Sequence, residues 1–220
     1  MRTIISSAPI ASPMSNSTPL ASGAEGTVSL TEFFGRPAVS KTRLPKGYRI
    51  PELDSAIRSR RTRSEVRLMI EARKAGVRTP VVYLVDPKEG LIVMERIEGP
   101  TVKSRLDTHP EEACEICGSI GRNLAHLHNA GIAHGDLTTS NMIVMADGRL
   151  CFIDFSMGMF PADEEAIGVD VRLLERAFAS AHPGMDEAYS CLIGEYCKVK
   201  TDSDAVMAKV REIKERGRYT

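Results

Sequence analysis

The feature that most constrains the fold of this chain is a polar segment, His134-Gly-Asp-Leu-Thr-Thr-Ser-Asn141, followed directly by a hairpin pattern. Apolar residues fill positions 142–146 and 150–153, and Asp147-Gly148 between them is a strong signal for a tight turn. A hairpin brings the chain back to where it began. We therefore expect Asp154, at the end of the returning strand, to face Asn141 across the turn.

The polar groups that this hairpin would gather suit metal-assisted phosphate chemistry. Carboxylate and amide oxygens are ligands that Mg²⁺ prefers, so Asn141 and Asp154 are candidate metal ligands. Asp136, held off the metal, could accept a proton from an attacking hydroxyl. The alternative is that these residues only cap turns. A single Asp-x-x-x-x-Asn would be weak evidence, but the complete set with its leading His134 favours a site.

Two weaker signals precede this segment. Ser22-Gly-Ala-Glu-Gly-Thr-Val28 lies between two expected strands, and Gly23 and Gly26 would let backbone N–H groups approach a phosphate. It is not a Walker loop, because no Gly-Lys-Ser/Thr follows, and taken alone it is only a turn. Lys41, thirteen residues after Val28, has apolar neighbours in an expected strand, where a lysine needs an anionic partner.

Glu65 is the best candidate carboxylate partner for Lys41. It lies on a helix expected from about Thr62 to Ala75, which Gly76 and Pro80 would end. Thr62-x-x-Glu65 is also a capping-box pattern, and the two roles of Glu65 do not exclude each other.

The order of the expected elements predicts an α+β protein with a small β-rich lobe joined to a larger α-rich lobe, and the family resemblance described below implies that this is a minimal two-lobe, protein-kinase-like fold. Strands are expected at 27–34, 36–41, 81–85 and 91–94, and a short edge strand near Leu20. Helices are expected at 110–130, 170–181, 185–198 and 202–216, after a break at Glu98-Gly-Pro100. We assign residues 1–19 to a flexible Ser/Pro-rich tail, 20–97 to a β-rich N-lobe, 98–210 to an α-rich C-lobe and 211–220 to a basic tail.

Charge is unevenly distributed along the chain. The 29 basic and 29 acidic residues cancel, yet residues 36–78 hold 13 Lys and Arg against four acids, a net charge of +9. A second basic group lies near the end of the chain: Lys209, Arg211, Lys214, Arg216 and Arg218. Such surfaces attract phosphates, although a solvated basic helix face explains them equally well. With no Trp and 5% aromatics, sequence-specific RNA reading is not expected.

Composition narrows the class of protein further. A hydrophobic content of 42% with 26% charged residues is ordinary for a globular protein. The longest apolar runs are too short to cross a bilayer, and no signal-peptide stretch is visible, so we expect no membrane partner and a cytoplasmic location. The five cysteines (114, 117, 151, 191 and 197) form no paired framework, so we expect reduced, mostly buried thiols.

In order and approximate spacing, these motifs resemble those of protein kinases over roughly residues 20–200: Gly-x-x-Gly-x-Val, Val-x-Lys, a helix Glu, Val-Met-Glu, His-x-Asp-x-x-x-x-Asn and Asp-Phe. The resemblance implies that Lys41 holds the ATP α- and β-phosphates and pairs with Glu65. It makes Asp136 the catalytic base and assigns Mg²⁺ to Asn141 and Asp154.

The resemblance also implies an adenine pocket and a brace for the catalytic loop. Gly23, Gly26 and Val28 would contact ATP from the glycine turn. Met94 would stand behind adenine, with the Glu95 carbonyl and the Ile97 amide reading its edge, and Asp170 would brace the loop.

Three departures from the kinase pattern limit what the chain can act on. Gly135 replaces the Arg of His-Arg-Asp, and Ser156 replaces the Gly of Asp-Phe-Gly. Only fourteen residues separate Phe155 from Asp170, with no Ala-Pro-Glu. A long activation segment with its peptide-docking platform is therefore not expected, which puts activity on other proteins in doubt but leaves ATP binding intact.

Further motifs are similar to those of the small atypical kinase/ATPase subunit of the KEOPS complex, which installs threonylcarbamoyladenosine in tRNA. They are Lys46-Gly-Tyr-Arg-Ile-Pro-Glu-Leu-Asp54, Arg61-Thr-Arg-x-Glu65, Glu175-Arg-Ala-Phe178, His182-Pro183 and Arg216-Gly-Arg-Tyr219. The resemblance implies an autophosphorylating serine/threonine kinase with ATPase activity. It implies the threonylcarbamoyl-transferase subunit as partner of the C-lobe, a small helical subunit as partner of the N-lobe, and tRNA at the basic surface and tail.

Two other classes of protein stay open. Small-molecule kinases of the aminoglycoside or choline type also use His-Gly-Asp, although about eighty residues after Asp136 leave little room for their substrate lobe. A nucleotide-binding scaffold without turnover would keep the same motifs.

Overall fold

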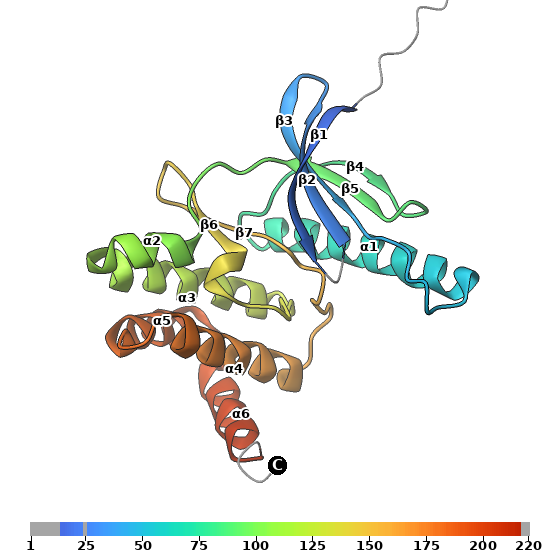
Figure 1. The fold of residues 1–220 in the computed structure, drawn as a ribbon. Coiled ribbons are helices and arrows are strands. Elements are labelled where there is room, and N and C mark those ends of the chain that lie inside the picture. The colour runs from blue at the N-terminus through green and yellow to red at the C-terminus, as the bar shows by residue number, and fades with distance from the viewer. Residues whose placement is uncertain (1–13, 24–25, 217–220) are drawn as a thin grey trace, which may run out of the picture.

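The structure is a computed structural model that describes residues 14–23 and 26–216. Its first part is an antiparallel five-stranded sheet in the order β1-β2-β3-β5-β4 (Figure 1). The strands are β1 (Met14–Gly23), β2 (Gly26–Phe33), β3 (Arg36–Thr42), β4 (Val82–Asp86) and β5 (Leu91–Glu95). The strand expected near Leu20 begins at Met14, so residues 14–19 belong to the sheet and not to the tail. The rest of that tail lies outside the described residues.

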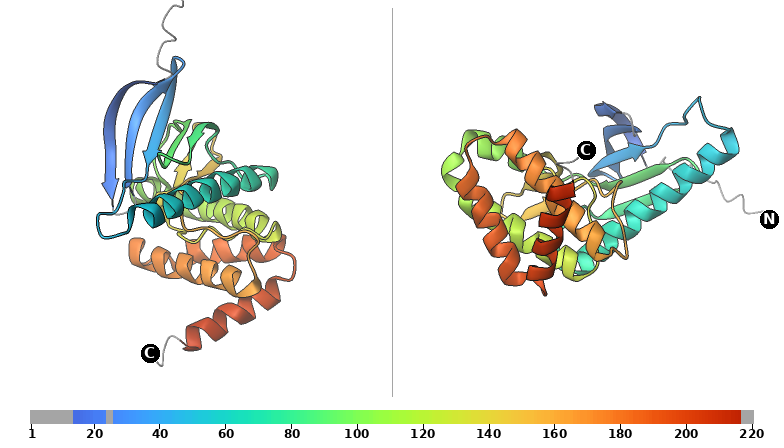
Figure 2. Two further views of the ribbon diagram at one scale, coloured as in Figure 1. Left: turned by 90° about the vertical axis from the view of Figure 1, so that its right-hand side faces the viewer. Right: turned by 90° about the horizontal axis from the view of Figure 1, so that it is seen from below.

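Helix α1 (Pro51–Lys74) runs alongside the sheet (Figure 2). It begins eleven residues before the expected Thr62, because its first half is polar and carries little apolar periodicity. Pro51 in the first turn, with Glu52 and Asp54, suits a helix N-terminus. Thr62 is therefore in the helix interior, where its hydroxyl donates to the Arg58 carbonyl at 2.8 Å. The capping-box interpretation of Thr62 and Glu65 is wrong.

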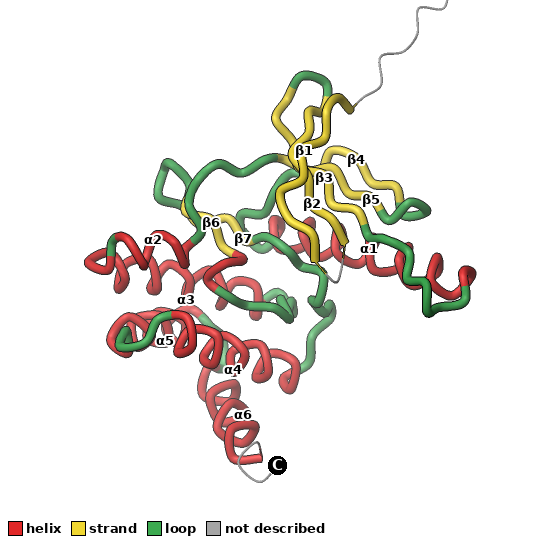
Figure 3. The backbone as a smooth tube through the Cα atoms, in the orientation of Figure 1, coloured by secondary structure: helices red, strands yellow, loops and turns green. Residues whose placement is uncertain are grey.

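The second part is helical. Figure 3 shows its helices below a small hairpin, with a loop leading from the hairpin to α4. The helices are α2 (Val102–Thr108), α3 (Ala113–Asn129), α4 (Glu164–Ala181), α5 (Asp186–Val199) and α6 (Ser203–Arg216), with 3-10 turns η1 (Pro110–Glu112) and η2 (Thr139–Asn141). The hairpin strands are β6 (Met142–Val144) and β7 (Leu150–Phe152). Helix α2 was not expected, because seven residues show too little periodicity.

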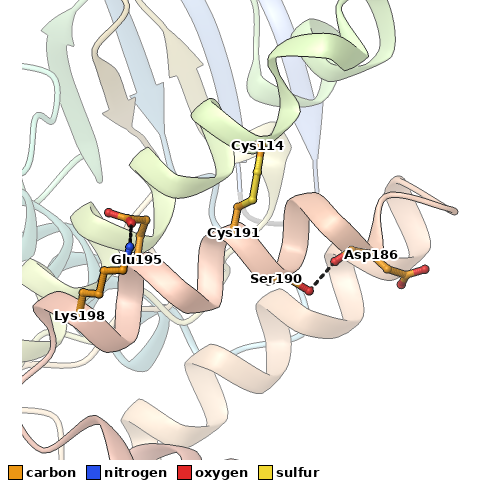
Figure 4. Close-up of a disulfide and its surroundings, with 6 residues drawn as sticks. All are labelled: Cys114, Asp186, Ser190, Cys191, Glu195 and Lys198. Atoms are coloured by element: carbon orange, nitrogen blue, oxygen red, sulfur yellow. Dashed lines mark hydrogen bonds and ion pairs between the residues drawn. A yellow bond between two sulfur atoms is a disulfide. The ribbon is translucent and has the colours of Figure 1, made fainter.

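Helices α3 and α5 pack with unusually close backbones. A Cβ atom on Gly121 would lie 2.1 Å from the Leu192 carbonyl oxygen, so only glycine fits there. The same two helices are joined by a Cys114–Cys191 disulfide, with Cα atoms 5.5 Å apart (Figure 4). The expectation that all five cysteines are reduced is wrong for this pair. A bond across 77 residues depends on helix packing, which cysteine spacing does not reveal.

One hydrophobic core extends across both parts of the chain. Ile120, Leu124 and Leu127 of α3 are fully buried in the same cluster as Leu68 and Met69 of α1. The observed architecture confirms the α+β, two-lobe expectation. Within residues 14–23 and 26–216, no helix has the length and apolar character needed to cross a membrane.

Candidate active site

The centre of the site is a buried lysine that joins three distant elements. Lys41 on β3 donates from Nζ to Glu65 Oε1 on α1 at 2.8 Å and to Asp154 Oδ1 at 2.7 Å. The Lys41 and Glu65 side chains are 7% and 1% exposed, whereas that of Asp154 is 37% exposed. The structure therefore confirms the partnership expected between Lys41 and Glu65, and it leaves the Asp154 end open to a ligand.

Arg43 is a member of this cluster that sequence reasoning missed. Its Nη2 donates to Glu65 Oε2, and its side chain is 3% exposed. The available signal was spacing, because Arg43 follows Lys41 by two residues, just past the end of β3, and an extended chain turns such residues to the same side. Glu65 thus serves two buried cations at once.

Asp154 has the strained backbone that is common at functional sites. Its φ is +62°, in the left-handed region that L-residues rarely adopt. Burial opposes ionisation of its carboxyl group, but the charge of Lys41 and its hydrogen bond outweigh burial and lower the pKa of Asp154. The Ser156 amide also donates to Oδ1, at 3.2 Å. Asp154 is therefore ready to bind a cation.

Asp136 and Asn141 lie together on the loop before the hairpin. Asn141 Nδ2 donates to the Asp136 carbonyl oxygen at 2.9 Å and to its carboxylate Oδ2 at 3.0 Å. Because the amide nitrogen is used in this way, the Asn141 side-chain oxygen is the atom left for a metal. The Ile153 amide donates to the Asn141 backbone carbonyl at 3.0 Å, which ties the loop to the residue before Asp154.

Asp170 on α4 holds this loop in place through hydrogen bonds. Its carboxylate accepts from the His134 and Gly135 backbone amides at 2.7 and 2.8 Å, and His128 Nε2 lies 3.2 Å away. The brace expected of Asp170 is present, although Asp170 lies in the second turn of α4 and not at its start.

Gly135 has a steric reason for replacing the arginine of the His-Arg-Asp pattern. Its φ is +79°, and a Cβ atom there would lie 2.2 Å from the Met157 carbonyl oxygen. The segment after Asp154 therefore passes directly over Gly135, and an arginine would displace it.

His134 is held as a neutral imidazole. Its Nε2 lies 3.0 Å from the Ile153 carbonyl oxygen, which can only accept, and its Nδ1 accepts from the Asp136 amide at 3.3 Å. Burial lowers the pKa of His134, so the neutral form persists. Its ring also packs against Phe155 with centroids 4.5 Å apart. His134 thus links the catalytic loop to the Asp-Phe segment by position and not by charge.

The glycine turn connects β1 to β2. Gly23 ends β1, and Val28 on β2 stands opposite Lys41 in the β2–β3 register. Gly26 has a φ of +153°, and a Cβ atom there would lie 2.1 Å from the Thr42 carbonyl oxygen. Glycine is therefore required at position 26 because the neighbouring strand β3 leaves no room for a side chain. Residues 24–25, between the two glycines, lie outside the described part.

The expected adenine-binding residues follow the end of β5. Met94 pairs with Val39 of β3, and the Glu95 carboxylate is taken by Arg78 at 2.5 Å and by the Val81 amide at 2.9 Å. The Glu95 amide also donates to the Val81 carbonyl, at 2.8 Å, so the contacts of Glu95 hold the end of β5, and the role expected of its carbonyl stays a prediction. Half-buried Ile97 follows in the segment that leads to α2.

The donor set fits the ligands that the kinase resemblance implies. Two oxygen donors on either side of the β6–β7 hairpin suit Mg²⁺, and a buried amine beside them suits a polyphosphate. The structure brings Lys41, Glu65 and Asp154 into contact, and it brings Asp136 and Asn141 into contact.

The comparisons with known proteins agree with this geometry. A family model described as the RIO domain matches residues 49–188. The KEOPS complex subunit Bud32 of Pyrococcus abyssi is 42% identical over 207 residues, which cover 90% of this chain and 94% of that protein. The chain belongs to the Bud32 family of RIO-domain atypical kinases.

Other members of the Bud32 family differ in length and source. An EKC/KEOPS complex subunit of Mus musculus is 36% identical, with 89% of this chain and 84% of that protein covered. A "Probable bifunctional tRNA threonylcarbamoyladenosine biosynthesis protein" of Methanothermobacter thermautotrophicus is 44% identical over 91% of this chain. The chain spans only 36% of the length of that bifunctional relative. The kinase-like family indicated by the sequence motifs is therefore confirmed.

Proposed function

We propose that this chain is an ATP-dependent, autophosphorylating serine/threonine kinase and ATPase that acts as a subunit of the KEOPS complex. In that role it supports the formation of threonylcarbamoyladenosine in tRNA, which would place it in the cytoplasm. The observation that supports the chemistry most is the contact of Lys41 with both Glu65 and Asp154, because it unites strand, helix and hairpin at one point. The names of the Bud32 relatives support the assembly.

In the proposed reaction each side chain has a separate task. Lys41 holds the α- and β-phosphates, and Glu65 keeps its amine in place. Asn141 and Asp154 hold Mg²⁺, which neutralises charge on the phosphates when bound. The attacking hydroxyl oxygen forms a bond to the γ-phosphorus, the bond to the ADP oxygen breaks, and the hydroxyl proton passes to Asp136. With water as the attacking group the same step is ATP hydrolysis.

The contact between Lys41 and Asp154 has a consequence for ligand binding. A phosphate on Lys41 and a metal on Asp154 would each have to replace the contact that joins these two groups at 2.7 Å. We therefore expect nucleotide and Mg²⁺ to bind together, because phosphate on Lys41 releases Asp154 for the metal, and metal on Asp154 releases Lys41 for the phosphate. Adenine would rest between Val28 and Met94, with the Glu95 carbonyl and the Ile97 amide at its edge and the turn from Gly23 to Gly26 over the phosphates.

We propose the transferase subunit as the partner of the C-lobe and a small helical subunit as the partner of the N-lobe. For tRNA we propose the basic surface of residues 36–78 together with the basic tail, where acids pair with two of the cations. Lys214 contacts Glu175 at 3.0 Å and Arg216 contacts Glu165 at 2.7 Å. Arg218 lies outside the described residues.

A turnover assay on the full chain tests this proposal. ATP hydrolysis and autophosphorylation are measured with the chain alone, with the transferase subunit, and with that subunit and tRNA. Hydrolysis stimulated by the partner supports the proposal. Phosphorylation of a hydroxylated metabolite would identify a small-molecule kinase instead, and retained assembly without hydrolysis would identify a scaffold. The Asp136→Ala variant provides the background rate.

A further inference from the structure

Two sequence motifs at the C-terminal end of α4, Glu175-Arg-Ala-Phe178 and His182-Pro183, have no task in the proposed reaction. They meet in the structure. His182 caps α4, with its amide donating to the Phe178 carbonyl at 2.9 Å, and the rings of these two residues pack with their centroids 4.9 Å apart. Each of the two residues is 3% exposed. The motifs therefore form one buried unit with an imidazole at its end.

The His182 imidazole contacts the loop that carries the expected catalytic groups. Its Nε2 lies 2.8 Å from Oγ1 of Thr139, a residue that is 3% exposed and begins the η2 turn. Thr139 stands between Asp136, the expected base, and Asn141, the expected metal ligand, which ends the same turn. Helix α4 thus holds the loop at a second point, besides the backbone amides that donate to Asp170.

The other side of the ring indicates which partner donates in this hydrogen bond. His182 Nδ1 is buried without a hydrogen-bond partner among the described residues, and it lies 3.8 Å from Asp107 Oδ1 on α2. Because a carboxylate only accepts, its attraction favours a hydrogen on Nδ1 and leaves Nε2 to accept from the Thr139 hydroxyl. Burial lowers the pKa of His182, which keeps the ring neutral and this lone pair available.

The η2 turn leaves Asn141 little freedom once Thr139 is held. The Asn141 amide donates to the Thr138 carbonyl at 3.0 Å, and the Asn141 carbonyl accepts from the Ile153 amide at 3.0 Å. The turn is therefore tied to the hairpin at one end and to α4 at the other. Groups that orient metal ligands contribute to metal affinity although they do not touch the metal.

We propose that His182 is a positioning residue that acts through Thr139: it sets the place of Asn141, and with it the metal end of the candidate site. This role rests on the proposed function and deepens it. A Thr139–His182 pair that only stabilised the C-lobe would change the stability of the fold and leave metal binding unchanged.

The test uses the full chain and three measurements. They are hydrogen exchange of the Asn141 amide without ligand, Mn²⁺ affinity by electron paramagnetic resonance with a non-hydrolysable ATP analogue, and kcat for ATP hydrolysis. Thr139→Val removes the hydroxyl at nearly unchanged volume. It should speed exchange of the Asn141 amide, weaken Mn²⁺ binding about tenfold and lower kcat. Thr139→Ser keeps the hydroxyl and should restore all three.

Thr108→Val is the matched control. Thr108 Oγ1 also lies 2.8 Å from an imidazole nitrogen, His109 Nδ1, but this contact is exposed at the end of α2. The control should leave Asn141 exchange and Mn²⁺ affinity unchanged. His182→Leu removes both ring nitrogens, and combining it with Thr139→Val should cost no more than the larger single effect, because the two residues act as one unit.

Additive losses in the double variant would overturn the proposal. So would a Thr139→Val variant that melts at a lower temperature but keeps the wild-type Asn141 exchange and Mn²⁺ affinity, because its role would then be structural alone. The ligand-free measurement separates the two proposals. If the wild type shows no turnover while Thr139→Val speeds Asn141 exchange, only the catalytic proposal is refuted. If the wild type turns over and Asn141 exchange is the same in both, only the role of His182 is refuted.

Discussion

Two of the buried polar networks in the described part of the chain support the candidate site, and they differ in how much freedom they leave. The N-lobe network consists of charged groups, Lys41, Arg43 and Glu65, and it extends to Asp154 of the C-lobe. The C-lobe network consists of Asp170 with His128, the loop amides of His134 and Gly135, and the Tyr196 hydroxyl, which lies 2.8 Å from His128 Nδ1.

The difference between these networks lies in their exposure. Asp154 is 37% exposed at the end of the N-lobe network, so its partner can be exchanged for a ligand. His128 and Asp170 are at most 2% exposed, and every contact there is internal. The N-lobe network can thus exchange a partner for a ligand, whereas the C-lobe network holds the loop of Asp136 in position. Removing a group from each should separate activity from stability.

The largest effect should come from the reactive carboxylates. Asp136→Ala and Asp154→Ala should each abolish autophosphorylation, with the loss of the base alone costing roughly 10²–10⁴ in rate. Neither group belongs to the core, so a thermal melt should show a folded protein. Global unfolding of either variant would contradict the division between the two networks.

Asp170→Ala should instead destabilise the fold. It leaves two buried backbone amides and a buried histidine without their acceptor, which typically costs about 3–5 kcal/mol of unfolding free energy. Denaturant unfolding measures this change. Asp170→Asn keeps an acceptor oxygen and should lose less. A loss of activity with unchanged stability would assign Asp170 to the reactive network.

The disulfide offers a second way to weaken the C-lobe alone. Closing a loop of 77 residues restricts the unfolded chain, so Cys191→Ser should lower the unfolding free energy by about 2–4 kcal/mol. Cys197→Ser is the control, because Cys197 is a half-buried free thiol. ATP affinity should not change, and melting with and without reductant should reproduce the difference for the wild type and Cys197→Ser but not for Cys191→Ser.

The smallest effect concerns acid. Burial lowers the pKa of His134, so below pH 6.5 the unfolded chain binds a proton that the folded chain does not. Stability is therefore complete above pH 6.5 and falls as the pH decreases towards the folded-state pKa, by up to about 1.4 kcal/mol per pH unit. Burial also lowers the pKa of His182, which adds to the trend. Unfolding free energies between pH 7.5 and 5.5 should show the slope, and His134→Gln should reduce it.

The hairpin, the Lys41–Glu65 pair and the Asp170 brace were predictable from sequence motifs, whereas other supports of the candidate site were not. Asp136, Asn141 and Asp154 lie close together in the chain, so a hairpin signal is enough to bring them together. Arg43 follows Lys41 just past the end of β3, and only the packing of α1 against the sheet shows that both cations reach Glu65. The Cys114–Cys191 bond and the need for Gly135 arise where segments far apart in sequence touch, and local patterns carry no information about such contacts.

The shared core also determines how the lobes can move. Leu68 and Met69 of α1 are buried in the same cluster as residues of α3. The helix that carries Glu65 is therefore anchored in the core of the C-lobe. Wide opening of the two halves would expose that cluster to water. Nucleotide entry should therefore not require the lobes to separate, and amide hydrogen exchange should find the second half of α1 protected to the same degree as α3.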